Sequence, residues 1–184
     1  MRRAYIDAIG MYVPENVVTN KDLEAMMDTS DEWIRERSGI QERHHVRGES
    51  TTDLALKASE EALAKAGMVA ADIEHIIFST MANDYFVPGG GPMMTRRLGI
   101  PGTPAVDIRM ACSGFLYGLS IAKAFIESGA HDNVLLITSE VQSVALDFST
   151  AGRDTAVLFG DGAAATILKA TDEDCGLISI KTHS

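Results

Sequence analysis

Residues 105–125 read A-V-D-I-R-M-A-C-S-G-F-L-Y-G-L-S-I-A-K-A-F, a short apolar run that leads through small residues into a helical pattern. The pattern predicts a strand and then a helix from Ser113 to about Ser128, because apolar residues recur at three- and four-residue spacing. Gly129 is positioned to end that helix. The order of strand, tight turn and helix predicts one unit of an α/β fold, with Cys112 in its turn.

Cys112 is the first candidate for a functional residue. A residue at the start of a helix lies at the positive end of the helix dipole, beside unpaired backbone N–H groups. Thiols in such positions ionise more readily than free cysteine, and the thiolate is the nucleophile. Ser113 and Gly114 are small and leave room for a substrate carbonyl. The residues alone leave two interpretations, a nucleophile or an inert cysteine that is buried as a small hydrophobe.

The rest of the chain alternates between strand and helix patterns. Strands are predicted at Arg3–Val13, Ile73–Thr80, Ala105–Ile108, Val134–Ser139, Ala163–Leu168 and from Gly176 to the end. Helices are expected from an Asn20 cap to Met27, after a Thr29–Glu32 capping box, from a Ser50 or Thr52 cap to Gly67, and up to Gly99. Helices between strands imply right-handed crossovers and a mostly parallel sheet covered on both faces, so the predicted class is α/β.

The composition favours a soluble, cytoplasmic enzyme built as one domain over residues 1–184. The formal net charge of −10 argues against nucleic acid as the main partner. No apolar run approaches the ~18 residues that a membrane span needs. Two cysteines do not make a disulfide framework, which favours a reducing compartment. Cys175 follows three acidic residues that disfavour a thiolate, so no catalytic role is expected for it.

Arginines are locally enriched between Trp33 and Gly48, at Arg35, Arg37, Arg43 and Arg47. In an acidic chain, such a cluster suggests an anion site for phosphates. The alternative, a solvated loop with scattered ion pairs, is favoured when the cluster is considered alone.

Two glycine-rich stretches invite a phosphate-loop interpretation. Pro88–Pro92 lacks both the Walker ending and the dinucleotide-binding spacing, so a sharp turn into a helix is the better explanation. The small residues of Phe159–Ala165 are expected to let a strand run close to another backbone.

Three motifs together resemble beta-ketoacyl-acyl-carrier-protein synthase III, a family of condensing enzymes in the thiolase superfamily that start bacterial fatty acid synthesis. They are T-S-D-E-W-I at 29–34 with Arg37 and Gly39-Ile40, A-C-S-G-F at 111–115, and F-G-D-G-A at 159–163. The resemblance runs from Tyr5 to about His183. Relatives in the same branch that make alkenes, quinolones or polyketide starters share these motifs.

The resemblance implies a fold of two similar halves, each a mixed, mostly parallel five-stranded sheet with helices on both faces. This chain resembles only the first, nucleophile-bearing half. In the family, a His and an Asn from the second half assist decarboxylation, and no motif of that kind occurs here. We therefore expect a fragment, or one part of a split protein, that is inactive alone and not a stable monomer. A homodimer or a complex with a second-half chain is expected.

The resemblance also assigns site residues. Cys112 corresponds to the acylated nucleophile and Trp33 to the residue that stacks on the adenine of coenzyme A. Arg37 and Arg153 match arginines around the adenine and phosphates. The pantetheine and acyl channel is lined at the positions of Leu158 and Phe159.

Three positions depart from the family pattern. Ser38 replaces a common threonine and keeps a hydroxyl. Asp154 stands where glycine is common and is expected to pair with Arg153, which would weaken phosphate binding. Val87 stands where several members carry a bulky aromatic residue that floors the partner's acyl pocket. The smaller side chain leaves room for longer or branched primers, unless Phe86 swings in instead.

The implied reaction transfers an acyl group from acyl-CoA to Cys112 and then condenses it, with loss of carbon dioxide, with malonyl-acyl-carrier-protein. Coenzyme A thioester is a substrate, and no metal or redox cofactor is expected. Two other classes remain open. One is a non-catalytic half that binds a partner chain, and the other is a thiolase-type enzyme that uses acetyl-CoA and a second cysteine.

Overall fold

The computed structural model describes residues 2–183, and the chain divides into two compact units. The sheet unit comprises the residues up to Tyr12, Thr51–Glu140 and those from Ala163 onward. The hairpin unit comprises Val13–Ser50 and Val141–Gly162. Each unit is assembled from segments that are far apart in the sequence.

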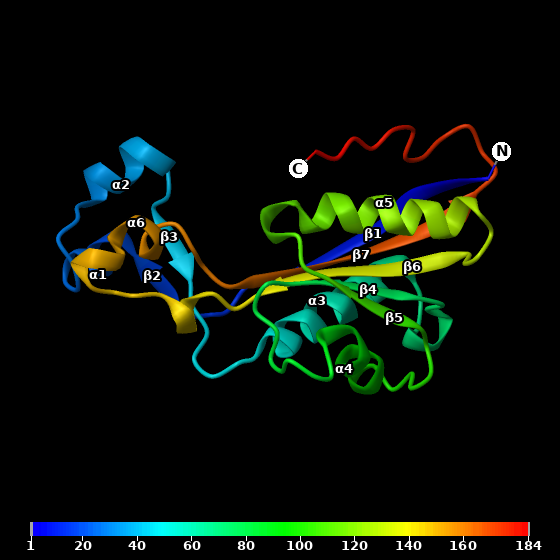
Figure 1. Ribbon diagram of the computed structural model, residues 1–184, viewed down its shortest axis with the longest axis horizontal. Helices are drawn as coiled ribbons and strands as arrows, with labels where there is room; N and C mark the ends of the chain where they lie inside the picture. The colour runs from blue at the N-terminus through cyan, green and yellow to red at the C-terminus, as the bar shows by residue number, and fades with distance from the viewer. Residues whose placement is uncertain (1, 184) are drawn as a thin grey trace. The chain divides into compact units, whose positions relative to one another are not determined.

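The sheet unit is built on five strands in the order β1-β7-β6-β4-β5 (Figure 1). Their bounds are β1 Arg3–Tyr12, β4 Ile76–Ser79, β5 Ala105–Ile108, β6 Asn133–Glu140 and β7 Gly162–Thr171. Strand β4 pairs in parallel with both β5 and β6, whereas β1 pairs antiparallel with β7. The predicted mixed five-stranded α/β sheet is confirmed.

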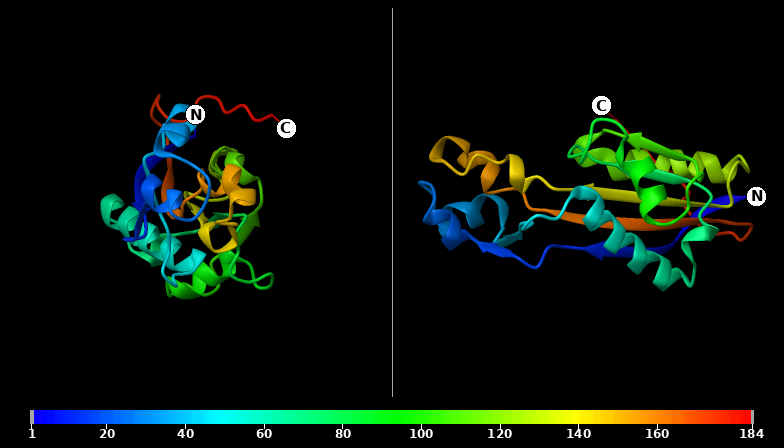
Figure 2. Two further views of the ribbon diagram at one scale, coloured as in Figure 1. Left: turned by 90° about the vertical axis from the view of Figure 1, so that its left-hand side faces the viewer. Right: turned by 90° about the horizontal axis from the view of Figure 1, so that it is seen from below.

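Helices cover both faces of this sheet. Helix α3 (Thr51–Ala66) packs against β1 and β6, and α4 (Gly90–Arg97) packs against β4 and β5. Helix α5 (Gly114–Glu127) lies on the opposite face (Figures 1 and 2). Short 3₁₀ turns at Ala70–Asp72 and Ala111–Ser113 precede β4 and α5. The apolar stripe predicted for α5 is buried, with Leu119, Ala122 and Ile126 in the core.

Glycines set the spacing between these layers. A Cβ atom at Gly10 of β1 would lie 2.2 Å from the Ala58 carbonyl oxygen of α3. One at Gly118 of α5 would lie 2.4 Å from Leu136 of β6. Because neither position can hold a methyl group, both helices approach the sheet backbone closely.

The hairpin unit contains a two-stranded antiparallel sheet and three short helices. The strands are β2 Val17–Thr19 and β3 Glu42–His44, and the helices are α1 Asn20–Glu24, α2 Asp31–Ser38 and α6 Arg153–Ala156. Further 3₁₀ turns lie at Ser143–Ala145 and Thr150–Gly152. The unit's core consists of Leu23, Met27, Ile34, Ala156 and Val157.

The predicted caps of the first two helices were each wrong by one residue. Thr19, not Asn20, caps α1, because the Thr19 side chain and the Asp22 carboxylate form a reciprocal capping box. The Asn20 amide instead donates to Asp31 Oδ1 and to the Ile40 carbonyl, both at 2.8 Å. Helix α1 ends at Glu24 and does not reach Met27.

Ser30, not Thr29, caps α2. The Ser30 hydroxyl accepts the Trp33 N–H at 3.1 Å.

The first turn of α3 is held by a carboxylate from a distant loop. Asp84 accepts the backbone N–H of Thr51 at 2.8 Å and that of Thr52 at 3.1 Å. The Thr52 hydroxyl donates to the same carboxylate at 2.6 Å. A carboxylate at this end also complements the helix dipole.

The sixth predicted strand, from Gly176 onward, was wrong: residues 172–183 contain no strand. The Leu177 N–H donates to the Ala4 carbonyl of β1 at 2.7 Å. Gly176, at φ 121°, interrupts the extended backbone that a ladder needs. Leu177 and Ile180 still pack against the core beside α5.

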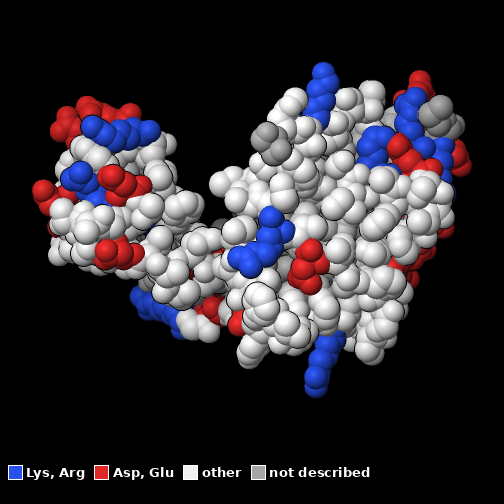
Figure 3. Space-filling view, in the orientation of Figure 1, with Lys and Arg blue, Asp and Glu red and all other residues white. Residues whose placement is uncertain are grey.

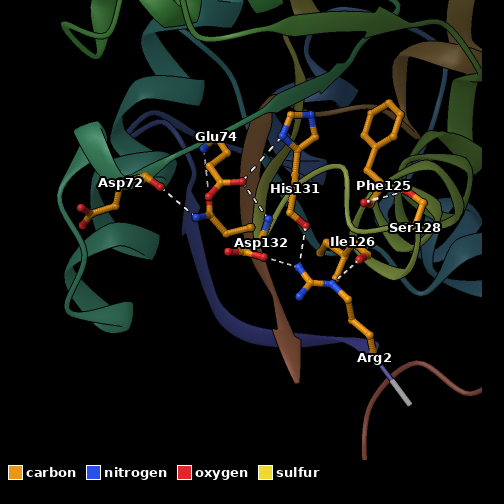
Figure 4. Close-up of polar contacts among 9 residues, drawn as sticks. Arg2, Asp72, Glu74, Phe125, Ile126, Ser128, His131 and Asp132 are labelled. Atoms are coloured by element: carbon orange, nitrogen blue, oxygen red, sulfur yellow. Dashed lines mark hydrogen bonds and ion pairs between the residues drawn. The ribbon is translucent and has the colours of Figure 1, made fainter. Parts of the chain in front are cut away.

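The carboxyl end of α5 is fastened by a polar network (Figure 4). Arg2 Nε donates to the Ile126 carbonyl at 2.6 Å, and the same guanidinium forms an ion pair with Asp132. Asp132 N–H donates to Glu74 Oε2 at 2.7 Å. A cation at this position complements the negative end of the α5 dipole.

His75 is a buried imidazole behind this network. It is 8% exposed, and its ring lies 4.7 Å from the Phe125 ring and 4.8 Å from the His131 ring between centroids. Within residues 2–183, neither ring nitrogen has a hydrogen-bond partner. Burial, and secondarily His131, lowers the pKa of His75.

We expect the free energy of unfolding to fall as the pH drops below about 6.5. In that range the imidazole of His75 binds a proton in the unfolded chain more readily than in the folded chain, where its pKa is lowered. Above that pH, the contribution of His75 is fully present. Urea unfolding between about pH 5 and 7.5 measures this slope. His75→Gln should flatten it, whereas His183→Gln, at an exposed imidazole, should not. Equal slopes in all three proteins would contradict the assignment.

Candidate nucleophile and nucleotide pocket

Cys112 lies in the 3₁₀ turn Ala111–Ser113, directly before α5. Cys112 is exposed, which does not fit the alternative of a cysteine buried as a small hydrophobe. Ala111 has φ 46°, a left-handed conformation that residues with a side chain rarely adopt. Such local strain clusters at functional sites, where surrounding structure maintains it.

The contact between α5 and β4 positions this turn. A Cβ atom at Gly114 would lie 2.0 Å from the Ser79 hydroxyl oxygen, so the first turn of α5 lies directly against the end of β4. The turn is closed by the Ser113 N–H, which donates to the Met110 carbonyl at 3.1 Å. The thiol is therefore presented from a backbone that is fixed on both sides of it.

The hairpin unit contains a cavity of about 610 Å³ around Trp33. Its lining consists of Trp33, Ile34, Arg37, Ser38, Arg153, Asp154, Val157 and Leu158. The Arg37 and Arg153 guanidinium carbons lie 4.4 and 4.6 Å from the Trp33 ring centroid. Trp33, Arg37 and Arg153, three of the four residues predicted to contact coenzyme A, thus lie together. Both arginines make cation–π contacts with the Trp33 ring.

Short helices hold these three side chains. Trp33 and Arg37 are one turn apart on α2, and Arg37 Nη1 donates to the Trp33 carbonyl at 3.3 Å. Arg153 begins α6, and its Nη1 donates to the Asp28 carbonyl at 2.9 Å. Arg153 also pairs with Asp154, Nε to Oδ1 at 3.7 Å, as predicted.

Leu158 and Phe159 follow α6. Both side chains are exposed, and Leu158 lines the cavity.

The four clustered arginines do not form one anion site, which agrees with the favoured alternative of scattered contacts. Arg43 is buried and donates to backbone carbonyls. Arg35 pairs with Asp31 at 3.5 Å, and Arg47 donates to Asn16 Oδ1 at 2.6 Å. Of the four arginines, Arg37 lines the cavity.

The two glycine-rich stretches are structural, as predicted. A Cβ atom at Gly90 would lie 2.4 Å from the Phe78 ring, and Gly91 N–H donates to Asp107 Oδ1 at 2.9 Å. In the second stretch, Asp161 is buried and accepts backbone N–H groups from Val46 and Ser143. These glycines permit close packing, which explains their number without a phosphate ligand.

Phe86 and Val87 lie in the loop before α4. They are 92% and 78% exposed, respectively. Val87 lines a shallow groove together with Tyr85, Pro88 and Met93.

Residues 2–183 contain neither a candidate metal centre nor a candidate membrane span. The described histidine, cysteine and carboxylate side chains form no group of three that could hold a metal ion. No helix in the described range has the length and apolar composition to span a membrane.

Sequence reasoning missed the backbone support of the pocket. Arg43, in β3, and His45, directly after it, bond to the carbonyls of Val157 and Phe159. The β-branched run Val17-Val18-Thr19 was the available signal for β2, whose pairing with β3 places these side chains.

Comparison with known proteins gives one consistent result. Residues 106–184 match the family described as 3-oxoacyl-[acyl-carrier-protein (ACP)] synthase III. Over its whole length, the chain is 42% identical to beta-ketoacyl-[acyl-carrier-protein] synthase III of Clostridium perfringens, of which it covers 56%.

Two solved structures are similar. That of 3-oxoacyl-[acyl-carrier-protein] synthase III from Aquifex aeolicus superposes with a TM-score of 0.89 at 42% identity, covering 92% of this chain and 55% of that one. The priming beta-ketosynthase of the R1128 polyketide biosynthetic pathway superposes with 0.87 at 32% identity, covering 92% and 51%. The chain spans about half the length of the curated relatives it matches. The chain is thus similar, over its whole length, to the amino-terminal half of proteins named beta-ketoacyl-[acyl-carrier-protein] synthase III.

Proposed function

We propose that this chain is the nucleophile-bearing half of a condensing enzyme of fatty acid biosynthesis, an acyltransferase. The observation that carries the proposal is the exposed Cys112 thiol in a strained turn at the amino end of α5. Neither a binding module nor a structural protein requires a cysteine in that position.

The proposed reaction begins when the Cys112 thiolate attacks the carbonyl carbon of an acyl-CoA thioester. Backbone N–H groups at the helix start hold the oxyanion, and coenzyme A leaves as its thiolate. The acyl group then resides on the Cys112 sulfur. Malonyl-acyl-carrier-protein loses carbon dioxide, and the resulting carbanion attacks the carbonyl carbon of this thioester. The C–S bond to Cys112 breaks, which releases the Cys112 thiolate and gives a beta-ketoacyl product on the carrier protein.

Coenzyme A is proposed to bind in the cavity around Trp33. Trp33→Ala should raise the dissociation constant for acetyl-CoA roughly tenfold, because it removes ~1–2 kcal/mol of stacking on the adenine. Quenching of the lone tryptophan measures binding to the unsubstituted protein, and calorimetry measures it for both proteins. An unchanged dissociation constant would place the nucleotide elsewhere.

The donors that stabilise the carbanion are proposed to lie in a second half. The sheet unit carries exposed apolar side chains on its surface, among them Ile9, Met11, Leu116 and Ile178. Figure 3 shows a face of this unit on which Lys, Arg, Asp and Glu are sparse. Such a surface fits a chain that is covered by a second half or by a second copy in a cytoplasmic homodimer.

A condensation assay tests the proposal. The chain alone should not turn over malonyl-acyl-carrier-protein, should scatter light as an oligomer, and should gain activity when a second-half chain is supplied. Cys112 should nevertheless take an acyl group from acetyl-CoA, which mass spectrometry detects. A monomer that condenses without added protein would overturn this division of the active site.

A second candidate is a priming synthase for polyketides or related acyl chains that accepts longer or branched primers. The similarity to the R1128 priming ketosynthase and the small Val87 side chain favour it. A series of acyl-CoA thioesters of increasing length, scored by acylation of Cys112 in the complete assembly, separates the two. A Val87→Phe variant should shorten the accepted chain if this position floors the pocket.

A further inference from the structure

One wall of the Trp33 cavity is a segment with little regular structure. Val157 and Leu158 follow directly after the four-residue helix α6 and line the cavity. Three hydrogen bonds connect this segment, Val157–Asp161, to strand β3 and the residue after it. Arg43 Nη2 donates to the Val157 carbonyl at 2.9 Å, His45 Nε2 lies 3.4 Å from the Phe159 carbonyl, and Asp161 N–H donates to the His44 carbonyl at 2.8 Å.

Gly160 lets the segment lie this close to β3. A Cβ atom there would be 3.1 Å from the Arg43 Cβ and 3.2 Å from the His44 carbonyl oxygen. The wall is therefore a stretch of backbone that packs directly against β3. Its position depends on the β3 groups that bond to it, above all the Arg43 side chain and the His44 carbonyl.

Arg43 makes the buried side-chain contact among these three. Its side chain is 5% exposed, and its second terminal nitrogen donates to the Val18 carbonyl on β2 at 3.3 Å. One rigid guanidinium thus joins β2, β3 and the carboxyl end of α6 through two carbonyls. A lysine ammonium is a point donor on a flexible stem and does not reproduce this fork.

Charge alone does not explain a guanidinium in this place. Its partners are neutral carbonyls, and burial is costly for a cation without an anionic partner. Burial also separates it from the solvent-facing side of the cavity, where Arg37 and Arg153 stack on Trp33. The geometry fits a structural fork that presets the wall, and it does not fit a group that attracts phosphate.

We infer that Arg43 is a positioning residue for the nucleotide pocket, which fixes the Val157–Leu158 wall before coenzyme A arrives. The inference rests on the proposed coenzyme A site. A preset wall raises affinity because binding does not have to order the segment.

The test compares Arg43→Met, Arg43→Lys and Arg37→Met by calorimetry with acetyl-CoA. Arg43→Met should raise the dissociation constant about tenfold. Arg43→Lys should restore little of this, because it returns the charge without the fork. The Arg43→Met loss should persist at about 0.5 M salt, whereas the loss in Arg37→Met, at a half-exposed guanidinium, should shrink through screening.

Hydrogen exchange provides the second measurement. Without ligand, the amides of residues 157–161 should exchange faster in Arg43→Met, while those of the sheet unit should not change. Arg35→Met is the matched control, because it removes an exposed arginine of the same unit that pairs with Asp31. It should alter neither exchange nor affinity.

Failure of the proposed coenzyme A site and failure of the Arg43 inference give different results. If the unsubstituted chain does not bind acetyl-CoA, the proposed site is overturned and the inference with it. If that chain binds and Arg43→Met binds equally well, or if Arg43→Lys restores full affinity, the inference alone is overturned. Should Arg43→Met lose its cooperative unfolding transition, Arg43→Lys carries the test, with reduced affinity and faster exchange at 157–161 as the expected result.

Discussion

Iodoacetamide is expected to alkylate Cys112 at least about tenfold faster than Cys175 in the folded chain near neutral pH. Both thiols are exposed, so access does not separate them. What separates them is the backbone: Cys112 precedes the fourteen-residue helix α5, whereas Cys175 lies outside any helix or strand beside Asp174. The oriented N–H groups at the amino end of a helix stabilise negative charge on an attacking sulfur, and a cysteine outside any helix lacks that support.

Mass spectrometry of tryptic peptides measures both rates in one sample. Denaturation should erase the difference, because the dipole and the oriented N–H groups disappear with the fold. Cys112→Ser should abolish acylation by acetyl-CoA, and Cys175→Ser should leave it unchanged. Equal alkylation rates in the folded chain would remove the nucleophile from this proposal.

The second large effect is expected in the hairpin unit, at Asp161. Its Oδ1 accepts the N–H groups of Gln142 and Ser143, each at 2.8 Å, and its Oδ2 accepts the Val46 N–H at 2.7 Å. Asp161→Ala leaves one buried and two part-buried donors without their acceptor, so we expect a loss of about 3 kcal/mol or more in the free energy of unfolding.

Urea unfolding followed by Trp33 fluorescence reports on this unit directly, because Trp33 belongs to it. Asp154→Ala is the matched control: it makes the same change at a side chain that is 85% exposed, and it should cost less than about 0.5 kcal/mol. Asp161→Asn should fall between the two, since its amide retains one acceptor oxygen. A change of the same small size in all three variants would mean that the buried carboxylate does not hold the unit together.

The elements that the sequence predicted are those whose patterns are local. The apolar stripe of α5, the short strand β5 and the glycine stops after α3 and α5 each depend on neighbours within a few residues. The two helix caps were predicted one residue away from Thr19 and Ser30, because in each case two adjacent residues have side chains that can cap a helix. Only the backbone conformation decides which of them does so.

What the sequence could not predict depends on pairing over long distances. Strand β3 lies more than twenty residues after β2 in the sequence. The pairing of these two strands places the Arg43 side chain inside the unit, where it donates to carbonyl groups and does not face an anion in solvent. The stretch from Gly176 has a strand-like composition. It could form a strand only by pairing with the free edge of β1, and there the Leu177 N–H donates to the Ala4 carbonyl without a ladder forming. Among the site residues, the family resemblance selected Trp33, Arg37 and Arg153, which the cavity brings together.

The glycines of α5 that contact the sheet limit which substitutions this helix can accept over generations. Alanine is ordinarily the better helix former, by about 1 kcal/mol per glycine replaced. Gly114 and Gly118 cannot accept that gain, because Ser79 and Leu136 occupy the space of the added methyl group. A lineage can therefore vary the loops and the outward face of α5, whereas alanine at Gly114 or Gly118 would push the helix, and with it the Cys112 turn, away from the sheet.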